Sequence, residues 1–134
     1  MFQMTIEFKV GRTKIDEHGH VNHAYHYMMY QKGRQSLLHL AGLDTESLRR
    51  DYNLGLFVVH TEADYKKQLF KDDVVLIHTK IADIGRTSIT FDQAITVGDY
   101  DIASTGKIVQ VLTNANGQPE PINDELRRML MEYS

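Results

Sequence analysis

The sequence predicts an α+β domain in which one antiparallel sheet packs against a single long helix. Only one long segment, from about residue 23 to residue 41, has apolar side chains at helical spacing around most of its circumference. Four long segments with alternating apolar residues follow it, and the connections between them are too short for parallel crossovers. One early helix followed by consecutive strands is an order typical of α+β proteins.

Five segments are predicted to be strands. The first runs from Thr5 to Thr13, with Ile6, Phe8 and Val10 on one face. The other four are predicted at Leu56–Leu69, Val74–Ile84, Thr87–Val97 and Ile102–Thr113. Tight turns at 71–73, 85–86 and 98–101 make the strands that they join antiparallel. The edge strands of such a sheet need covering, so we expect self-association.

The long helix is predicted from His23 to Ala41. Asn22 is a suitable N-cap, and Gly42 occupies the position after the C-terminus where glycine is favoured. Gly33 lies inside this helix at a cost of about 1 kcal/mol relative to alanine, so we expect another element to pack closely on that turn.

A second, shorter helix is predicted at the C-terminal end. It runs from Asp124 to Met131 and has Asn123 as its N-cap. The charge-rich segment 44–53, between the long helix and the next strand, is interpreted as a polar linker.

Length and composition indicate one globular domain spanning residues 1–134. The absence of Cys excludes disulfides and thiolate zinc sites. A net charge of -3 argues against a nucleic-acid partner, which would favour a basic protein. The longest run without a polar side chain is six residues, whereas a membrane span needs about 20. With no signal-peptide pattern, we expect a cytoplasmic protein without a membrane partner.

Four histidines, His18, His20, His23 and His26, fall within nine residues beside Asp16 and Glu17. Imidazole and carboxylate groups can bind Zn, Ni or Fe, and His23 and His26 are spaced to share a helix face. The spacing of the whole group matches no common metal signature. We therefore predict neither a metal nor a cofactor, and chelator-sensitive activity would overturn this.

The same segment is also suited to acyl transfer. The first backbone N–H groups of a helix have no partner within the helix and can stabilise a developing oxyanion. Asp16 lies six residues before the predicted cap, Asn22, on a loop that can fold back across the helix start. A carboxylate there could attack a bound carbonyl or activate water. Capping of the loop itself is the structural alternative for Asp16.

The residues from Asp16 to Ala24, followed by Tyr25, Tyr30 and Arg34, resemble the opening motif of the hot-dog-fold acyl-CoA thioesterases of the 4-hydroxybenzoyl-CoA thioesterase type. Segments 54–67, 84–88 and 116–119 are similar to later parts of that family. The resemblance implies a hot dog fold, in which a five-stranded antiparallel sheet wraps around one long helix. It also implies a homodimer or a dimer of dimers, with active sites at the dimer interface.

The resemblance also assigns roles to individual residues. Asp16 falls on the catalytic aspartate, which acts as nucleophile or general base. His23 falls on the position whose backbone N–H polarises the thioester carbonyl, and in several bacterial members its imidazole is also counted as catalytic. The predicted substrate-binding residues are Gly19, His20, Val21, Asn22, Tyr30 and Arg86. Further candidates to hold the phosphates of coenzyme A are Lys66, Lys67 and Lys71.

The sequence departs from the family pattern at two positions. Arg12 stands where members with the catalytic histidine often have a tyrosine, and Gln31 stands where glutamate is common.

The function implied by the resemblance is hydrolysis of an acyl-CoA thioester, or of an acyl carrier protein thioester, to free acid and thiol. The alternative is a non-catalytic acyl-CoA-binding module, which would keep the pocket but would not need the carboxylate of Asp16. A hot-dog dehydratase would need a different motif, which is not found in this sequence.

Overall fold

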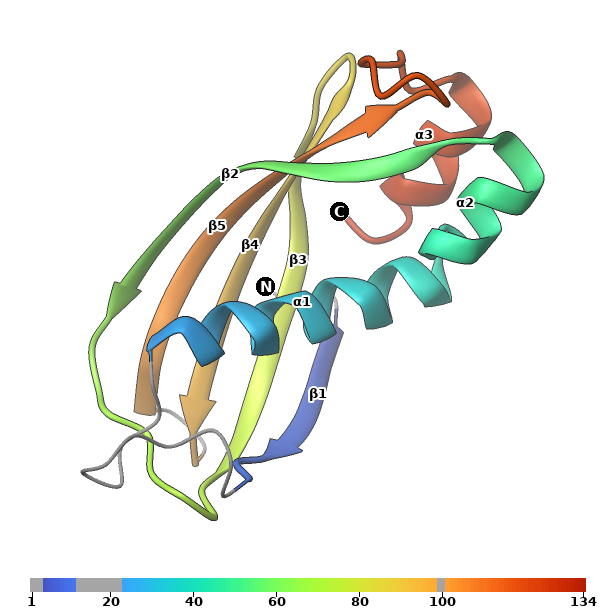
Figure 1. The fold of residues 1–134 in the computed structure, drawn as a ribbon. Helices are drawn as coiled ribbons and strands as arrows, with labels where there is room; N and C mark the ends of the chain where they lie inside the picture. The colour runs from blue at the N-terminus through green and yellow to red at the C-terminus, as the bar shows by residue number, and fades with distance from the viewer. Residues whose placement is uncertain (1–3, 12–22, 99–100) are drawn as a thin grey trace.

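A computed structural model describes residues 4–11, 23–98 and 101–134, and shows a curved antiparallel sheet lying across helix α1 (Figure 1). The sheet contains five strands in the order β1-β3-β4-β5-β2 within this described part. The strands are β1 (Met4–Lys9), β2 (Gly55–Tyr65), β3 (Val74–Ile84), β4 (Ser88–Val97) and β5 (Asp101–Thr113). The predicted five-stranded antiparallel sheet is confirmed.

Strand β2 ends earlier than the sequence predicts, at Tyr65 rather than Leu69. The N–H groups of Lys66 and Lys67 both donate to the carbonyl of Ala103, at 2.8 and 3.1 Å. Two donors on one acceptor cannot continue the regular pairing of the ladder, so the strand stops there. As the partner of β5 only, β2 forms one edge of the sheet, and β1 forms the other.

Helix α1 runs from His23 to Leu40, one residue short of the predicted end. Gly42 has a φ of 80°, a left-handed conformation in which glycine carries no steric penalty, and the N–H of Leu43 donates to the carbonyl of Leu38 at 2.8 Å. The close neighbour expected at Gly33 is present. A Cβ atom there would fall against Thr79 Oγ1 and 2.9 Å from Gln93 Nε2.

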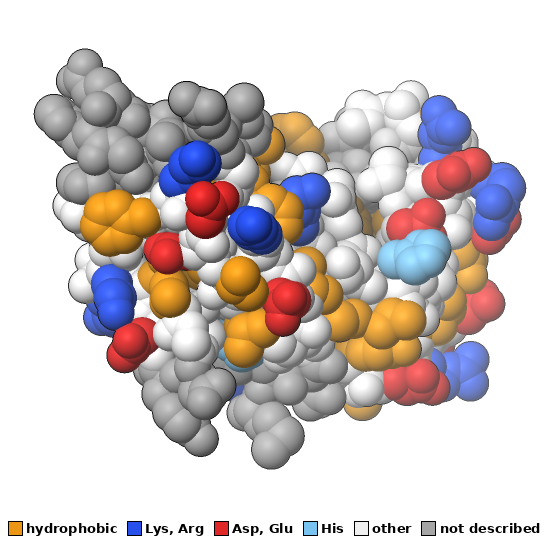
Figure 2. Space-filling model, turned by 90° about the horizontal axis from the view of Figure 1, so that it is seen from below, with side chains coloured by type: hydrophobic (Ala, Val, Ile, Leu, Met, Phe, Trp, Pro, Cys, Tyr) orange, Lys and Arg blue, Asp and Glu red, His pale blue; other side chains and the backbone are white. Residues whose placement is uncertain are grey.

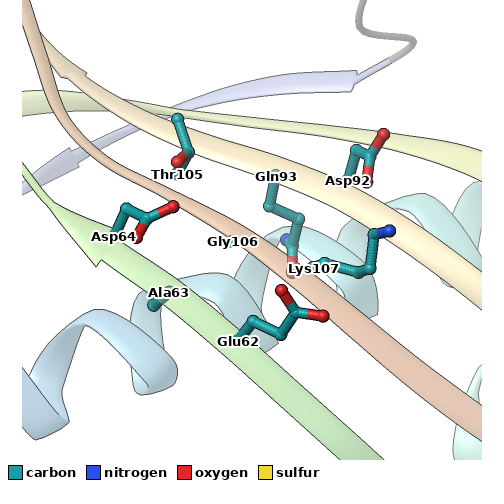
Figure 3. Close-up of a pocket in the computed structure, with 8 residues that line it drawn as sticks. All are labelled: Glu62, Ala63, Asp64, Asp92, Gln93, Thr105, Gly106 and Lys107. Carbon is teal, nitrogen blue, oxygen red and sulfur yellow. The ribbon is translucent and has the colours of Figure 1, made fainter.

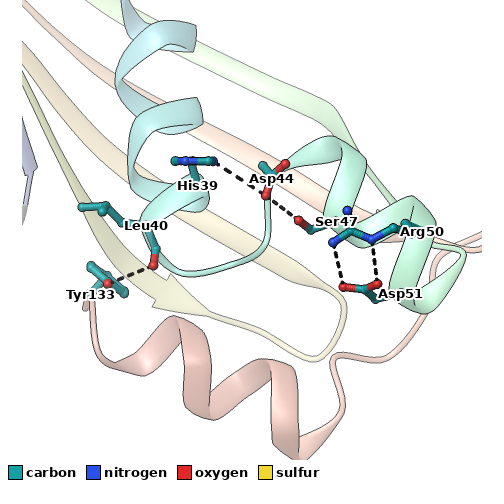
Figure 4. Close-up of polar contacts among 7 residues, drawn as sticks. All are labelled: His39, Leu40, Asp44, Ser47, Arg50, Asp51 and Tyr133. Atoms are coloured by element: carbon teal, nitrogen blue, oxygen red, sulfur yellow. Dashed lines mark hydrogen bonds and ion pairs between the residues drawn. The ribbon is translucent and has the colours of Figure 1, made fainter.

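The prediction of a polar linker at 44–53 was wrong, because this segment contains helix α2 (Thr45–Tyr52). Ser47 donates a hydrogen bond to Asp44 at 2.7 Å, and Arg50 pairs with Asp51 along the same short helix (Figure 4). Leu48 is its only buried side chain, and Tyr52 also packs against the core and donates a hydrogen bond to Glu125 at 3.2 Å.

Helix α3 (Asp124–Met131) matches its prediction, and the side chain of Asn123 accepts a hydrogen bond from the N–H of Leu126 at 2.8 Å. Beyond α3, the hydroxyl of Tyr133 donates to the carbonyl of Leu40 (Figure 4). Helices α2 and α3 lie at the end of the molecule away from the start of α1 (Figure 1). The described chain therefore has an 18-residue helix against the sheet, the predicted C-terminal helix, and α2, which was not predicted.

The core between α1 and the sheet has two apolar parts separated by a polar band. One part surrounds Tyr30, Ile77 and Ile108, and the other surrounds Phe91 and Leu37. Buried polar side chains lie between the two parts on four neighbouring elements: Arg34 on α1, Thr79 on β3, Gln93 on β4 and Gln110 on β5. We call these four residues the polar band.

The surface carries charges of both signs. Seen from below, basic and acidic side chains are interspersed with apolar ones, and no basic patch dominates this face (Figure 2). In the part of the chain that the structure describes, no helix is long and apolar enough to cross a membrane.

Candidate active site

The start of α1 is the centre of the candidate site. Helix α1 begins at His23 and carries no acidic residue in its first turn, so the positive end of the helix dipole is not compensated from within the helix. The first N–H groups of α1 have no acceptor within the helix itself. The predicted residues that precede it, Asp16, Gly19, His20, Val21 and Asn22, lie outside the described residues.

Three aromatic rings surround this helix start. The ring of Tyr65, at the end of β2, lies 5.9 Å from that of His23 and 5.0 Å from that of His26, edge-on to both. The Tyr65 hydroxyl also donates to the carbonyl of His23, at 3.4 Å. Burial raises the pKa of Tyr65 to about 12, so its phenol remains protonated at neutral pH. Tyr65 therefore connects the strand end to the first turn of α1.

A buried hydrogen-bond network lies beneath the same turn. The hydroxyl of Ser104 on β5 is 2.8 Å from Nδ1 of His26 and 2.5 Å from the hydroxyl of Tyr30. All three side chains are buried. Burial, and secondarily the nearby His23, lowers the pKa of His26 to about 4, so its imidazole is neutral at physiological pH. The network anchors two successive turns of α1 to β5.

This network makes stability depend on pH. The imidazole of His26 binds a proton below about pH 4 in the folded state, but below about pH 6.5 in the unfolded state. Between these values the unfolded chain binds more protons, so stability is fully present above pH 6.5 and falls as the pH drops towards 4, by about 3 kcal/mol from this group. We expect urea denaturation to show this slope in the wild type and a flatter one in His26→Gln.

The matched control for this prediction is His39→Gln. The side chain of His39 is 77% exposed and lies 3.9 Å from Asp44, so its replacement should change the pH dependence of unfolding far less than His26→Gln does. An equal slope in the wild type and in His26→Gln would show that His26 is not held neutral by the fold.

The two remaining predicted substrate-binding residues lie in different surroundings. Tyr30 has no exposed surface, and its hydroxyl is bonded to Ser104. Arg86 is exposed in the turn between β3 and β4, two residues before Ser88. Ser88 pairs with Val111 on β5, seven residues beyond Ser104, or roughly 20 Å along the strand. Within one subunit, Arg86 therefore lies far from the start of α1. Contacts of Tyr30 and Arg86 with substrate stay predictions.

Two of the candidate phosphate-binding lysines lie closer to the helix start. Lys66 and Lys67 follow Tyr65 directly, and Lys67 forms an ion pair with Asp101 at 3.0 Å. Lys71 pairs with Asp72 at 3.8 Å. Lys66 forms no ion pair within residues 4–11, 23–98 and 101–134, so its charge is the most readily available to a phosphate near Tyr65.

The metal hypothesis gains no support from the residues that the structure places. His23 is exposed, whereas His26 is buried with Nδ1 bonded to Ser104, so the two do not present free nitrogens on one face. Within the described ranges, no group of three or more histidine, aspartate or glutamate side chains could hold a metal ion. His18 and His20 lie outside these ranges.

Away from the start of α1, a hollow of about 320 Å³ lies over strands β2, β4 and β5 (Figure 3). Glu62, Asp64 and Asp92 line it together with one basic side chain, Lys107. Three carboxylates against one ammonium group repel phosphates, so this hollow is poorly suited to coenzyme A. The start of α1 remains the better candidate for an acyl-CoA site.

Comparison with known protein families identifies the family of this chain. A family model described as the thioesterase-like superfamily matches residues 10–130, which is nearly the whole chain. The chain belongs to the thioesterase-like superfamily. The narrower 4-hydroxybenzoyl-CoA type that the opening motif resembles is not established by this match.

Three proteins similar to this thioesterase-like chain illustrate the family. A protein of Aquifex aeolicus with the name "Putative esterase" is 27% identical over 107 residues, which cover 73% of this chain and 83% of that protein. The structure of a probable thioesterase from Bartonella henselae has a TM-score of 0.85 at 23% identity, with 92% of this chain and 100% of the other covered. A Staphylococcus aureus protein in complex with CoA has a TM-score of 0.89 at 18% identity, with coverages of 99% and 85%. These structures share the fold.

The structure of this thioesterase-like protein also reveals residues that the sequence alone did not indicate. Ser104 and the polar band lie on α1, β3, β4 and β5, and they are far apart in the sequence. The histidine cluster in the sequence contains His26 but does not indicate its buried partner, Ser104. A polar residue at an inward position of an otherwise apolar strand is the signal that could have pointed to Ser104, Gln93 and Gln110.

Proposed function

We propose that this protein is an acyl-CoA thioesterase, with Asp16 as nucleophile or general base and the first N–H groups of α1 polarising the thioester carbonyl. The observation that supports this most directly is the start of α1 at His23, seven residues after Asp16, in a chain of the thioesterase-like superfamily. The carboxylate supplies a nucleophile or base, and the helix start supplies the oxyanion site.

The reaction would follow from these two parts. The carbonyl oxygen of the thioester accepts hydrogen bonds from the start of α1, which draws electron density away from the carbonyl carbon. Asp16 then either attacks this carbon or removes a proton from an attacking water molecule. Where Asp16 activates water, the thiolate of coenzyme A leaves and takes up a proton, and the acyl group is released directly as a carboxylic acid. Where Asp16 attacks, departure of the thiolate leaves an acyl anhydride on Asp16, which a water molecule then hydrolyses to the free acid and the regenerated carboxylate.

Coenzyme A is the proposed thiol carrier of the substrate. Acyl carrier protein is the other thiol carrier to be tested. The structural neighbour with bound CoA supports a CoA-type ligand on this fold. Lys66, directly after Tyr65, is the proposed contact for a CoA phosphate at the helix start.

We also propose that the protein self-associates through β2. This edge strand exposes apolar side chains, with Phe57 at 65% and Val59 at 54% exposure, beside unpaired backbone groups. Pairing of two β2 strands would cover both features at once. Light scattering should give a mass of two or four chains, and a mass of 15.4 kDa, that of one chain, would contradict the proposal.

The function is tested by release of free thiol from a panel of acyl-CoAs with short, long, branched and aromatic acyl groups. A thioesterase turns over at least one of them, in the presence or absence of a chelator. The alternative, a non-catalytic acyl-CoA-binding module, predicts saturable binding of an acyl-CoA by calorimetry without release of thiol. That result would overturn the proposed activity.

A further inference from the structure

Arg34 is a buried cation without a matching anion. Its side chain is 7% exposed, and it forms no ion pair with any residue that the structure describes. Burial lowers its pKa to about 10, so the guanidinium remains charged at neutral pH. Removing a charge from water without a counter-ion is costly, and buried charges are therefore usually paired.

The hydrogen bonds of Arg34 leave part of its guanidinium open. Nε donates to Gln110 at 3.2 Å and Nη1 donates to Gln93 at 3.0 Å, which uses two of its five N–H donors. The structure gives Nη2 no partner among the described residues. Every fully buried side-chain nitrogen or oxygen in the described chain does have a partner. The open donors of Arg34 must therefore face a space that is not fully closed.

That space is a cleft of about 230 Å³ between α1, α2 and β2. Arg34 lines it together with the neutral polar side chains of Gln31 and Gln110, whereas Leu43, Leu48 and Leu56 form an apolar wall. No acidic side chain of the described residues lines this cleft. Asp44 and Glu46 line a neighbouring hollow instead.

We propose that this cleft binds the carboxylate of a small organic acid with an apolar body. A carboxylate matches the planar fork of a guanidinium and supplies the anion that Arg34 lacks. The amide groups of Gln31 and Gln110 can complete the polar end. The leucine wall favours a hydrocarbon body over a fully hydrated anion such as inorganic phosphate.

Two sources could supply such a carboxylate. It could be a free acid, such as the product of the proposed hydrolysis, or the far end of an acyl group that itself carries a carboxylate. The acyl group, and a free acid that is the product of hydrolysis, rest on the proposed function, whereas any other free acid does not. Binding of a free acid can be measured whether or not the protein hydrolyses thioesters, so failure of this inference and failure of the proposed activity are distinguishable.

The first arm of the test measures binding of hexanoate and of its neutral analogue hexanamide to the full-length protein by calorimetry. We expect hexanoate to bind at least about tenfold more tightly, because only the carboxylate forms an ion pair with Arg34 and can accept from its guanidinium with two oxygens. Arg34→Met should remove this preference, while Arg50→Met, at an exposed arginine on α2, should keep it. Equal binding of the two ligands to the wild type would overturn the proposal.

A second variant covers the case in which Arg34→Met does not fold. Leu56→Trp fills the cleft from β2 without changing Arg34, and it should abolish hexanoate binding. Retention of tight binding in Leu56→Trp would show that the acid binds elsewhere and would overturn the proposal.

The second arm distinguishes the two sources by comparing hydrolysis of adipoyl-CoA and hexanoyl-CoA. A preference for adipoyl-CoA that is lost in Leu56→Trp identifies the acyl group as the source. Hexanoate binding without such a preference identifies a free acid. Absence of both effects contradicts the proposed site.

Discussion

Replacing Asp16 by asparagine is expected to reduce the turnover of acyl-CoA by about a hundredfold or more while leaving substrate binding nearly unchanged. Asparagine has almost the same shape as aspartate but is neither a base nor an effective nucleophile. Loss of a positioned acid or base typically costs two to four orders of magnitude in rate. Steady-state thiol release, measured for both proteins on the best substrate of the panel, gives kcat and KM separately.

The matched control is Asp51→Asn, which makes the same chemical change on the exposed face of α2, where Asp51 pairs with Arg50. Its kcat should equal that of the wild type. If Asp16→Asn and Asp51→Asn had equal activity, Asp16 would be a loop-capping residue and the catalytic group would lie elsewhere.

Replacing Gly33 by leucine is expected to destabilise the protein by more than about 3 kcal/mol, beyond the usual range for an overpacked core. The new Cβ alone would fall against Thr79 Oγ1 and 2.9 Å from both Gln93 Nε2 and Ile77 Cγ2. The side chain would also displace Gln93, which donates to the carbonyl of Tyr30 and to Thr79, each at 2.8 Å. The midpoint and slope of urea denaturation measure the change.

Gly11→Leu is the control for Gly33→Leu. A Cβ at Gly11 would meet no atom of the described chain within 4 Å, so the same substitution there should change stability little. Similar unfolding midpoints for Gly11→Leu and Gly33→Leu would contradict the close packing of α1 against β3 and β4.

The elements set by local chemistry could be predicted from the sequence. Strand β3 and helix α3 have their predicted bounds, and α1 begins at His23 as predicted. Tight turns fix antiparallel neighbours, and Gly42 and Asn123 mark helix ends by conformations and hydrogen bonds that depend on a few adjacent residues. Such signals lie in short stretches of sequence and do not depend on the rest of the fold.

The features that depend on tertiary packing could not be predicted. Helix α2 is only eight residues long, is polar on average and buries only Leu48, so its sequence looks like a charged linker. The pairing of His26 with Ser104 joins residues 78 positions apart. The polar band combines side chains from four elements, and its composition becomes visible only when the register of β3, β4 and β5 is known. Single polar residues in apolar strands give no indication of their partners.

In the proposed mechanism, the start of α1 polarises the carbonyl of a bound thioester. The most direct measurement is the infrared stretching frequency of a ¹³C-labelled thioester carbonyl bound to Asp16→Asn, which should hold the substrate without hydrolysing it. We expect a lower frequency for the bound thioester than for the same thioester in water, because the N–H groups at the helix start withdraw electron density from the carbonyl. A frequency equal to or above that in water, at saturating protein, would contradict it.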